Sequence, residues 1–292
     1  MATFQILART GTISAAAHEL GVAPSAVSRR LKALEERLGT ELVRRSTRAM
    51  VLTPAGEAYL AKATALLTSI EALEDEIRDE ALGHAGHIRL AAPLSFGIAR
   101  LPAVLSRFLA DNPNITVELN LRDDQVDLLR EGYDLALRIG ELAPSTLIAK
   151  KIGDLPTVVA ASPGFVQAHG PFQSPHDLEG VVGLIYANKL RSDVLHWQEE
   201  GAEQRVQLNR GIVANNGDIL AEFAAAGHGV YAAPRFIMQK QIDEGRLVEI
   251  CAEAEWPKVA LHVIWPPTKH LPVRVRALID TLAAAFTGSP QA

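Results

Sequence analysis

Cysteine and long apolar runs are what this sequence lacks. Cys251 is the only cysteine in 292 residues, which excludes an internal disulfide bond and a cysteine-rich structural zinc site. No uninterrupted apolar run approaches the roughly 20 residues that a membrane-spanning helix needs. The first twelve residues have neither the basic start nor the apolar core of a secretory signal. We therefore expect a cytoplasmic protein that has no membrane partner.

Catalytic signatures are missing as well. The chain has no Gly-x-Ser-x-Gly elbow, no P-loop, no complete dinucleotide fingerprint and no His-Glu-x-x-His motif. His84 and His87 lie between glycines without an acidic or cysteine neighbour, which is too few ligands for a metal ion. We expect no catalytic residues, no metal and no cofactor. An enzyme whose catalytic residues are far apart in the chain stays an alternative, and turnover of a candidate effector would reveal it.

The composition is that of an ordinary globular protein, but its charge is divided unevenly. A chain of 292 residues with 48% hydrophobic and 22% charged residues can form two or three hydrophobic cores. The net charge is -5, yet the residues up to Met50 contain eight arginines and lysines against four glutamates. A basic end on an acidic protein indicates a polyanion-binding surface in that end.

The stretch from Ser14 to Leu38 is typical of a helix-turn-helix. Ser14 is a suitable N-cap for a short helix over Ala15 to Leu20, because its hydroxyl can accept from a free N–H of the first turn. Gly21 tolerates the left-handed conformation in which a helix stops sharply. Pro24 then fits the start of a second, longer helix.

The second helix has one apolar face and one free face. At about 100° per residue, Val27, Leu31 and Leu34 lie together, opposite small and basic residues. Arg29 suits a base contact, because a guanidinium pairs with both acceptors of a guanine edge, and Lys32 suits a phosphate. The alternative is a surface helix whose charged face is merely solvated. The predicted DNA-binding residues of this helix are Pro24, Ser25, Ser28, Arg29, Arg30 and Lys32.

The segment after this helix resembles a β-wing. Leu42 to Arg45 and Met50 to Leu52 are short strand-like runs, joined by the polar turn Ser46 to Ala49. Together with the helix, its arginines make a continuous basic footprint that suits the neutralisation of phosphates. The wing residues predicted to bind DNA are Arg44, Arg45 and Arg48.

A long helix is predicted next, from Thr53 as the cap and Pro54 at the first position to about Leu82. Apolar residues recur along it at alternating spacings of four and three, which is a heptad seam. The seam either covers a core of its own chain or forms a dimer; we favour the dimer, because a two-fold operator requires two reading helices. The seam consists of Tyr59 and the predicted dimerisation residues Ala63, Leu66, Ile70, Leu73 and Ile77.

Gly83 to His87 breaks the helix and marks a domain boundary, after which short strands alternate with helices. This alternation predicts an α/β domain with mainly parallel sheets. The expected strands are 88–92, 115–121, 135–139, 157–161, 181–186, 206–213, 229–232 and 259–265. The expected helices are 98–109, 124–130, 219–226, 235–241 and 273–286.

Several motifs in the first sixty residues are similar to one known family. They are Phe4 to Ala17, Leu20-Gly21-Val22, Ala26-Val27-Ser28-Arg29, Leu34-Glu35, Leu38-Gly39 and Leu52 to Gly56. Together they resemble the N-terminal winged helix-turn-helix of LysR-type transcriptional regulators. The resemblance implies that the start of the second helix reads the operator, that the wing arginines contact the DNA backbone, and that the long helix forms a dimer.

The rest of the chain resembles the effector-binding domain of the same family more weakly, for example through Ala92 to Gly97 and Leu129 to Gly140. That domain is similar to periplasmic binding proteins, with two α/β lobes connected by two crossing strands. The resemblance implies a winged helix-turn-helix domain over 1–56, a linker helix over 57–83, and an effector domain over 84–292 with lobes at 88–160 plus 267–292 and at 162–265.

An effector site is predicted where two helices begin on opposite lobes. Helix N-termini carry free N–H groups and the positive end of the helix dipole, so a facing pair suits a small anion. Arg138 would add positive charge, whereas Asp218 would disfavour an anion if it faced inward. Plain helix capping, or an ion pair for Arg138, is the alternative role. The predicted effector-binding residues are Ser95, Phe96, Gly97, Arg138, Asn215, Asn216 and Gly217.

Taken together, the sequence predicts a multidomain protein in which an all-α winged helix-turn-helix and a long linker helix precede a two-lobed α/β domain. We expect a DNA-binding transcriptional regulator that works as a homodimer or homotetramer. Its expected partners are double-stranded operator DNA, a small and anionic effector, and RNA polymerase. A small-molecule binding protein with an incidental basic end is the alternative, and it predicts no affinity for operator DNA at low salt.

Overall fold

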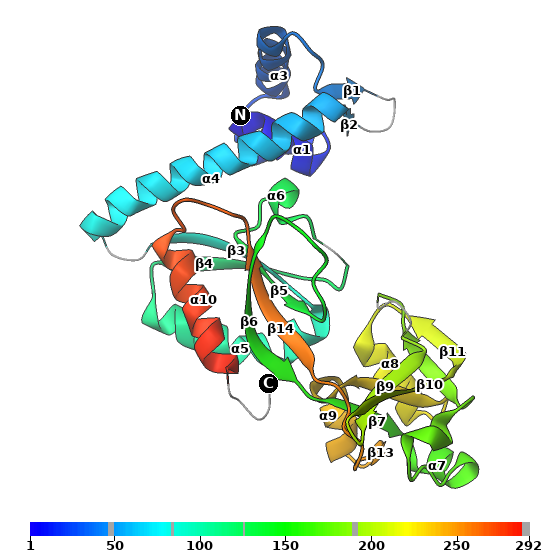
Figure 1. Ribbon diagram of the computed structural model, residues 1–292. Coiled ribbons are helices and arrows are strands. Elements are labelled where there is room, and N and C mark those ends of the chain that lie inside the picture. Colours follow the sequence, from blue (N-terminus) through cyan, green and yellow to red (C-terminus); the bar gives the residue numbers. More distant parts are fainter. Residues whose placement is uncertain (46–49, 83–84, 125, 189–191, 288–292) are drawn as a thin grey trace.

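The computed structural model describes residues 1–45, 50–82, 85–124, 126–188 and 192–287, with only the backbone given for 45, 68–69 and 71–82. A small N-terminal domain is followed by the long helix α4 (Pro54–Leu82) and then by two α/β lobes, the first of which is completed by the C-terminal part of the chain (Figure 1). No helix in these described stretches is long and apolar enough to cross a membrane.

The N-terminal domain is the predicted winged helix-turn-helix. Its elements are α1 (Ala2–Thr10), α2 (Ile13–Glu19), α3 (Pro24–Leu38), β1 (Val43–Arg45) and β2 (Met50–Leu52). The two strands pair in antiparallel register and form the wing. Side chains from every helix of the domain fill one core. That core includes Phe4, Leu7, Ala16, Val27, Leu31, Leu34, Leu42 and Leu60.

The cap of α2 differs from the prediction. Thr12, not Ser14, is the N-cap, because its Oγ1 accepts from Ala15 N at 3.2 Å while Ser14 lies inside the first turn. The cap of α4 is as predicted. Thr53 Oγ1 accepts from Gly56 N at 3.0 Å and donates to Glu41 O at 2.7 Å, which ties the start of the linker helix to the wing.

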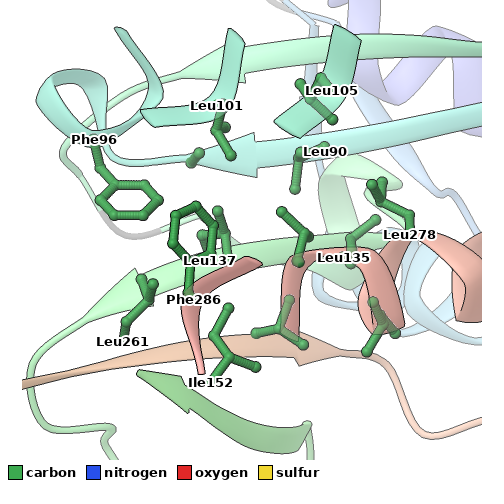
Figure 2. Packing of buried hydrophobic residues seen from close by; sticks show 14 of the residues in the cluster. Leu90, Phe96, Leu101, Leu105, Leu135, Leu137, Ile152, Leu261, Leu278 and Phe286 are labelled. Atoms are coloured by element: carbon green, nitrogen blue, oxygen red, sulfur yellow. The ribbon is translucent and has the colours of Figure 1, made fainter. Parts of the chain in front are cut away.

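The first lobe is built on a mixed five-stranded sheet with the order β4-β3-β5-β14-β6. Strands β3, β4 and β5 are parallel, and β14 is antiparallel to β5 and β6. Helices α5 and α10 pack on it around a core of leucine, isoleucine and phenylalanine (Figure 2). The elements are β3 (Gly86–Ala92), α5 (Leu94–Asp111), β4 (Ile115–Leu121), α6 (Leu128–Glu131), β5 (Leu135–Ile139), β6 (Ile148–Leu155), β14 (Val259–Trp265) and α10 (Val273–Phe286).

The second lobe has a five-stranded sheet with the order β11-β8-β12-β7-β13 and a separate hairpin of β9 and β10. Here too parallel and antiparallel pairs are mixed. The elements are β7 (Thr157–Ala161), α7 (Pro163–His169), a 3-10 helix (Pro175–Leu178), β8 (Val182–Tyr186), β9 (Val194–Glu199), β10 (Ala202–Gln207), β11 (Asn209–Ala214), α8 (Gly217–Ala225), β12 (Val230–Pro234), α9 (Arg235–Asp243) and β13 (Val248–Ile250).

Strands β7 and β14 each belong to the lobe opposite to the one predicted. Strand β7 hydrogen-bonds to β12 and β13 of the second sheet, and β14 joins the first sheet. The chain therefore crosses at Pro156 and again between 250 and 259, so the lobe boundaries of 160 and 162–265 were wrong by these two strands. Periodicity along one strand does not show which sheet it joins.

Three further expectations need correction. The helix predicted over 124–130 is only α6, because the Asp127 carboxylate caps it by accepting from Arg130 N at 3.0 Å. The strand predicted over 206–213 is two strands, β10 and β11, which separate at Leu208. Strands β6, β9 and β13 and helix α7 were missed; in β6 the first four residues, 148–151, are all exposed and do not alternate between apolar and polar.

Candidate DNA interface and effector site

The N-terminal end of α3 presents a free face beside the wing. Pro24, Ser25 and Arg29 are exposed and Ser28 is half-buried, whereas Val27 points into the core. A hollow of about 320 Å³ lies between α3 and β1, lined by Ser28, Arg29, Leu31, Lys32, Glu35 and Val43. The predicted base-reading residues therefore lie together on one accessible face.

The wing is fixed to α3 by a half-buried carboxylate. Glu35 Oε1 accepts from Leu42 N at 2.8 Å and from Val43 N at 3.2 Å, so the wing keeps a defined position beside the helix. Arg44 is exposed on β1 next to that face. The side chain of Arg45 and the whole of Arg48 lie outside the described residues.

Two basic residues of α3 have local partners. Arg30 Nη1 donates to Thr3 Oγ1 at 3.3 Å and so turns toward α1, away from the face that carries Arg29. Lys32 Nζ lies 3.6 Å from Glu36 Oε1, one helical turn further along, and both side chains remain largely exposed. Lys32 stays available to a phosphate, since an exposed pair of this kind is weak.

The heptad seam of α4 divides into a covered and an uncovered part. The Tyr59 ring packs edge-on against Phe4 with centroids 5.5 Å apart, and Ala63 is 1% exposed within its own chain. Further along, Leu66 is 53% and Ile70 is 50% exposed. The side chains of Leu73 and Ile77 lie outside the described residues. The intrachain role thus applies to the start of the seam, including Ala63, and leaves Leu66 and Ile70 uncovered.

Between the lobes, the start of α5 binds carboxylates of the protein itself. Leu94 N donates to Asp123 Oδ1 at 2.9 Å. Ser95, which is 7% exposed, donates its hydroxyl to Asp218 Oδ2 at 2.7 Å across the interface between lobes. A helix N-terminus attracts negative charge, and here the chain supplies it.

The start of α8 contributes from the opposite lobe. Asn216 caps α8, since its Oδ1 accepts from Ile219 N at 3.1 Å, and its Nδ2 donates to Asp123 Oδ2 at 3.2 Å. Asn188 Nδ2 donates to Asp123 O at 3.0 Å. We call Ser95, Asp123, Asn188, Asn216 and Asp218 the interlobe cluster. Its cross-lobe bonds join residues that are 65 to 123 positions apart in the chain.

Sequence reasoning found only part of this cluster. Asp123 and Asn188 were missed, because one follows a strand in a short polar turn and the other lies in a loop, with no periodic signal. Asp218 was named only as a residue that would disfavour an anion. It does face inward, toward Ser95.

Phe96 was predicted to bind effector, but its side chain belongs to the core. It is fully buried, and its ring centroid lies 5.6 Å from that of Phe236. The centroid of the Phe286 ring, which Figure 2 shows beside Phe96, is 5.1 Å away. Gly97 is buried against Leu121, which a Cβ at this position would overlap. The turn that opens α5 therefore offers Ser95 to the interlobe cluster and directs Phe96 into the lobe.

The other predicted effector residues lie near the interlobe cluster, but their side chains do not converge on one point. Asn215 is exposed, and its carbonyl oxygen accepts from Asn188 Nδ2 at 3.5 Å. Gly217, the first residue of α8, is buried. Arg138 Nη1 donates to Asp124 O at 3.1 Å, and burial lowers the pKa of its guanidinium. Arg138 therefore binds the backbone of Asp124 and Val126 rather than standing free.

The loop that carries Asp123 is also tied to α6. Arg122 forms an ion pair with Asp124, which lowers the pKa of that carboxyl to about 2, and its Nη1 donates to Glu131 Oε2 at 2.8 Å. Glu131 ends α6, and α6 packs against the linker helix α4 (Figure 1). One short segment thus touches the interlobe cluster at one end and the linker helix at the other.

Comparison with known proteins decides the family. The profile described as "LysR substrate binding domain" matches residues 81–287, and the profile "Bacterial regulatory helix-turn-helix protein, lysR family" matches residues 1–57. The chain belongs to the LysR family. It is a DNA-binding transcriptional regulator with a substrate-binding domain, and not an enzyme.

Similar proteins cover this LysR-family chain almost from end to end. An uncharacterised HTH-type transcriptional regulator of Haemophilus influenzae is 32% identical, over 92% of this chain and 93% of its own. PtxR of Pseudomonas aeruginosa is 31% identical, over 96% and 89%. The structure of CrgA from Neisseria meningitidis is similar with a TM-score of 0.61 at 28% identity, over 97% and 96%. Full-length AphB of Vibrio cholerae, at 23% identity over 97% of each chain and a TM-score of 0.60, shares the fold.

Proposed function

We propose that this regulator binds paired half-sites of operator DNA as a homo-oligomer and that a small-molecule effector bound between the lobes controls it. The observation that carries the proposal is the accessible N-terminal face of α3 beside the wing. Ser25, Ser28 and Arg29 are short or flexible side chains on that face, which suits entry into a major groove. Arg44 lies next to it and suits a phosphate.

The experiment is a salt titration of the full chain on the intergenic DNA beside its own gene, with random DNA of equal length as the control. We expect binding to the intergenic DNA to be tighter by about a thousandfold or more, because base contacts add to the shared phosphate term. Equal affinity for both DNAs at every salt concentration would contradict sequence-specific binding. No binding at low salt would favour the alternative of a ligand-binding protein with an incidental basic end.

The proposed oligomer uses the uncovered part of the linker helix. Leu66 and Ile70 lie one turn apart, and half of each side chain is exposed. Two such helices packed along their seams would bury both residues. Leu73 and Ile77 are the proposed continuation of this seam. The sedimentation experiment described next also distinguishes a dimer from a tetramer.

Replacing both Leu66 and Ile70 by glutamate is expected to dissociate the oligomer. An unpaired charge in an apolar seam costs several kcal/mol, so the association constant should fall by about 100-fold or more. Sedimentation velocity of the full chain measures this, with Ala61→Glu, exposed on the same helix but off the seam, as the matched control. A double variant that keeps the mass of the control would assign the oligomer to another surface.

The proposed control by an effector is a shift between arrangements of the two lobes. The interlobe cluster holds one arrangement through direct hydrogen bonds, and a ligand that replaces those bonds would favour another. The segment from Arg122 to Glu131 offers the route, since it connects the cluster to α6 and α6 packs against α4. A changed angle between paired linker helices would then alter the spacing of the two α3 helices and the bending of the operator.

Further partners follow from this role. We infer a cytoplasmic protein that contacts RNA polymerase at its target promoter. The sequence also predicted that the effector is an anion, because two helix N-termini with free N–H groups were expected to face it. The inward carboxylates of Asp123 and Asp218 weigh against it, because they already occupy the positions that an anion would take.

A further inference from the structure

Two carboxylates meet between the lobes, and the groups that hold them are neutral. Asp123, from the first lobe, accepts from Leu94 N and from the amide of Asn216. Asp218, from the second lobe, accepts from the hydroxyl of Ser95. Because the adjacent residues Leu94 and Ser95 hold one carboxylate each, both acids lie at the start of α5.

Two nearby cations that the structure describes, Arg122 and Arg138, bind other groups. Arg122 pairs with Asp124 and with Glu131, while Arg138 donates to the carbonyl oxygens of Asp124 and Val126. Over the stretches that the structure describes, no arginine, lysine or histidine forms an ion pair with Asp123 or Asp218. Two carboxylates at one helix start that have no counter-ion among the described residues repel one another, and a cation between them removes that repulsion.

The hydroxyl group of a largely buried tyrosine lies at the same place. Tyr231 is 2% exposed, and its Oη lies 3.3 Å from the position that a Cβ on Gly217 would occupy, between Asn216 and Asp218. No hydrogen-bond partner of this hydroxyl lies among the described residues. Burial raises the pKa of Tyr231, as do the nearby Tyr186, Asp218 and Asp123, so the phenol stays neutral. The oxygen of this hydroxyl is therefore free to accept a hydrogen bond from a ligand or from water.

We propose that the effector carries a primary ammonium group, which bridges Asp123 and Asp218 and donates its third hydrogen to Tyr231 Oη. This inference rests on the proposed function and names the ligand class for it. An ammonium group has three donors and no acceptor, which matches two carboxylates and one hydroxyl oxygen. Its bonds would join opposite charges, whereas Ser95 and Asn216 offer the two acids only neutral donors.

The replacement also supplies the switch. Ser95 and Asn216 each donate across the interface to the acid of the other lobe. Once an ammonium group takes over both acids, these two direct cross-lobe bonds are lost and the lobes are joined through the ligand. A ligand that binds only in the second arrangement shifts the population toward it. A carboxylate ligand would have to enter beside two negative charges, which is unfavourable.

The test fractionates a small-molecule extract of cells that carry the gene into cations, anions and neutral compounds by ion exchange. Each fraction, at equal conductivity in an amine-free phosphate buffer, is added to the full chain without DNA, and the melting temperature is measured. We expect the cation fraction to raise the melting temperature, because a ligand that binds only the folded protein stabilises it. The same fraction should change the affinity for operator DNA on the order of tenfold.

Two variants locate the effect. Asp218→Asn should abolish the rise in melting temperature, whereas Asp243→Asn, an exposed acid on α9 outside the cluster, should keep it. Cations that act on the DNA directly would change operator binding by both variants equally, and this equal effect distinguishes them from cations that bind the site. A melting curve of each variant without any fraction shows that it is folded.

The other outcomes overturn separate statements. A rise that Asp218→Asn retains would place the cation elsewhere and overturn this site. A response to the anion or neutral fraction alone, in melting and in operator binding, would overturn the ammonium group while the effector function stands. If no fraction changes either quantity, both the ammonium site and effector control are overturned.

Discussion

Phe96→Ala is expected to lower the free energy of unfolding by about 3–5 kcal/mol, the usual loss for a fully buried phenylalanine. The ring is 0% exposed and packs on Phe236 and Phe286, which come from α9 and α10. Removing it leaves a cavity in the first lobe and deletes a contact with the first turn of α9, which belongs to the second lobe. Urea unfolding followed by circular dichroism measures the loss.

Ile98→Ala is the matched control for this prediction. Ile98 lies on the same helix, two residues further on, and is 62% exposed. Its replacement should change the free energy of unfolding by about 0.5 kcal/mol or less, as is usual for surface positions. A loss below about 1 kcal/mol for Phe96→Ala would contradict a core role. In that case the residue would return to the group of candidate effector contacts, where the sequence first placed it.

Arg29→Ala is expected to weaken binding to the operator by about 5- to 150-fold, which corresponds to about 1–3 kcal/mol for a bidentate contact with a guanine edge. Arg29 is exposed on the N-terminal face of α3 and lines the hollow beside the wing. Binding to random DNA should fall much less, because that binding depends on phosphate contacts. Competition titrations of the full chain with operator and random DNA give both constants.

Arg37→Ala controls for the loss of charge. Arg37 is also exposed on α3 but lies in its last turn, at the end away from the groove-facing residues. Its replacement should reduce specific and random binding by similar, small factors. Equal losses on both DNAs for Arg29→Ala would show that Arg29 contacts phosphate and would leave Ser25 and Ser28 as the base-reading candidates.

The sequence by itself determined the DNA-binding end of this protein. Short-range signals specify a helix-turn-helix: an apolar repeat every three or four residues, a proline at Pro24 and a left-handed glycine at Gly21. Each of these signals acts within a few residues, so the sequence alone is enough to locate the helices. The N-cap of α2 was predicted at Ser14 and lies two residues earlier, at Thr12, so the start of the helix was still found. The exposed face of α3 followed directly from its periodicity.

Only the tertiary structure decided what lies between the lobes. The turn at Ser95 predicted a helix start and therefore free N–H groups, but the carboxylate that occupies it comes from Asp123, and the partner of Ser95 is Asp218, 123 residues away. Local periodicity also did not show that Phe96 turns into the core while Ser95 turns out of it. Contacts between distant segments depend on how the sheets pack, and packing is a property of the whole chain. For that reason the sequence predicted a site for an anion, and the structure places two acids there.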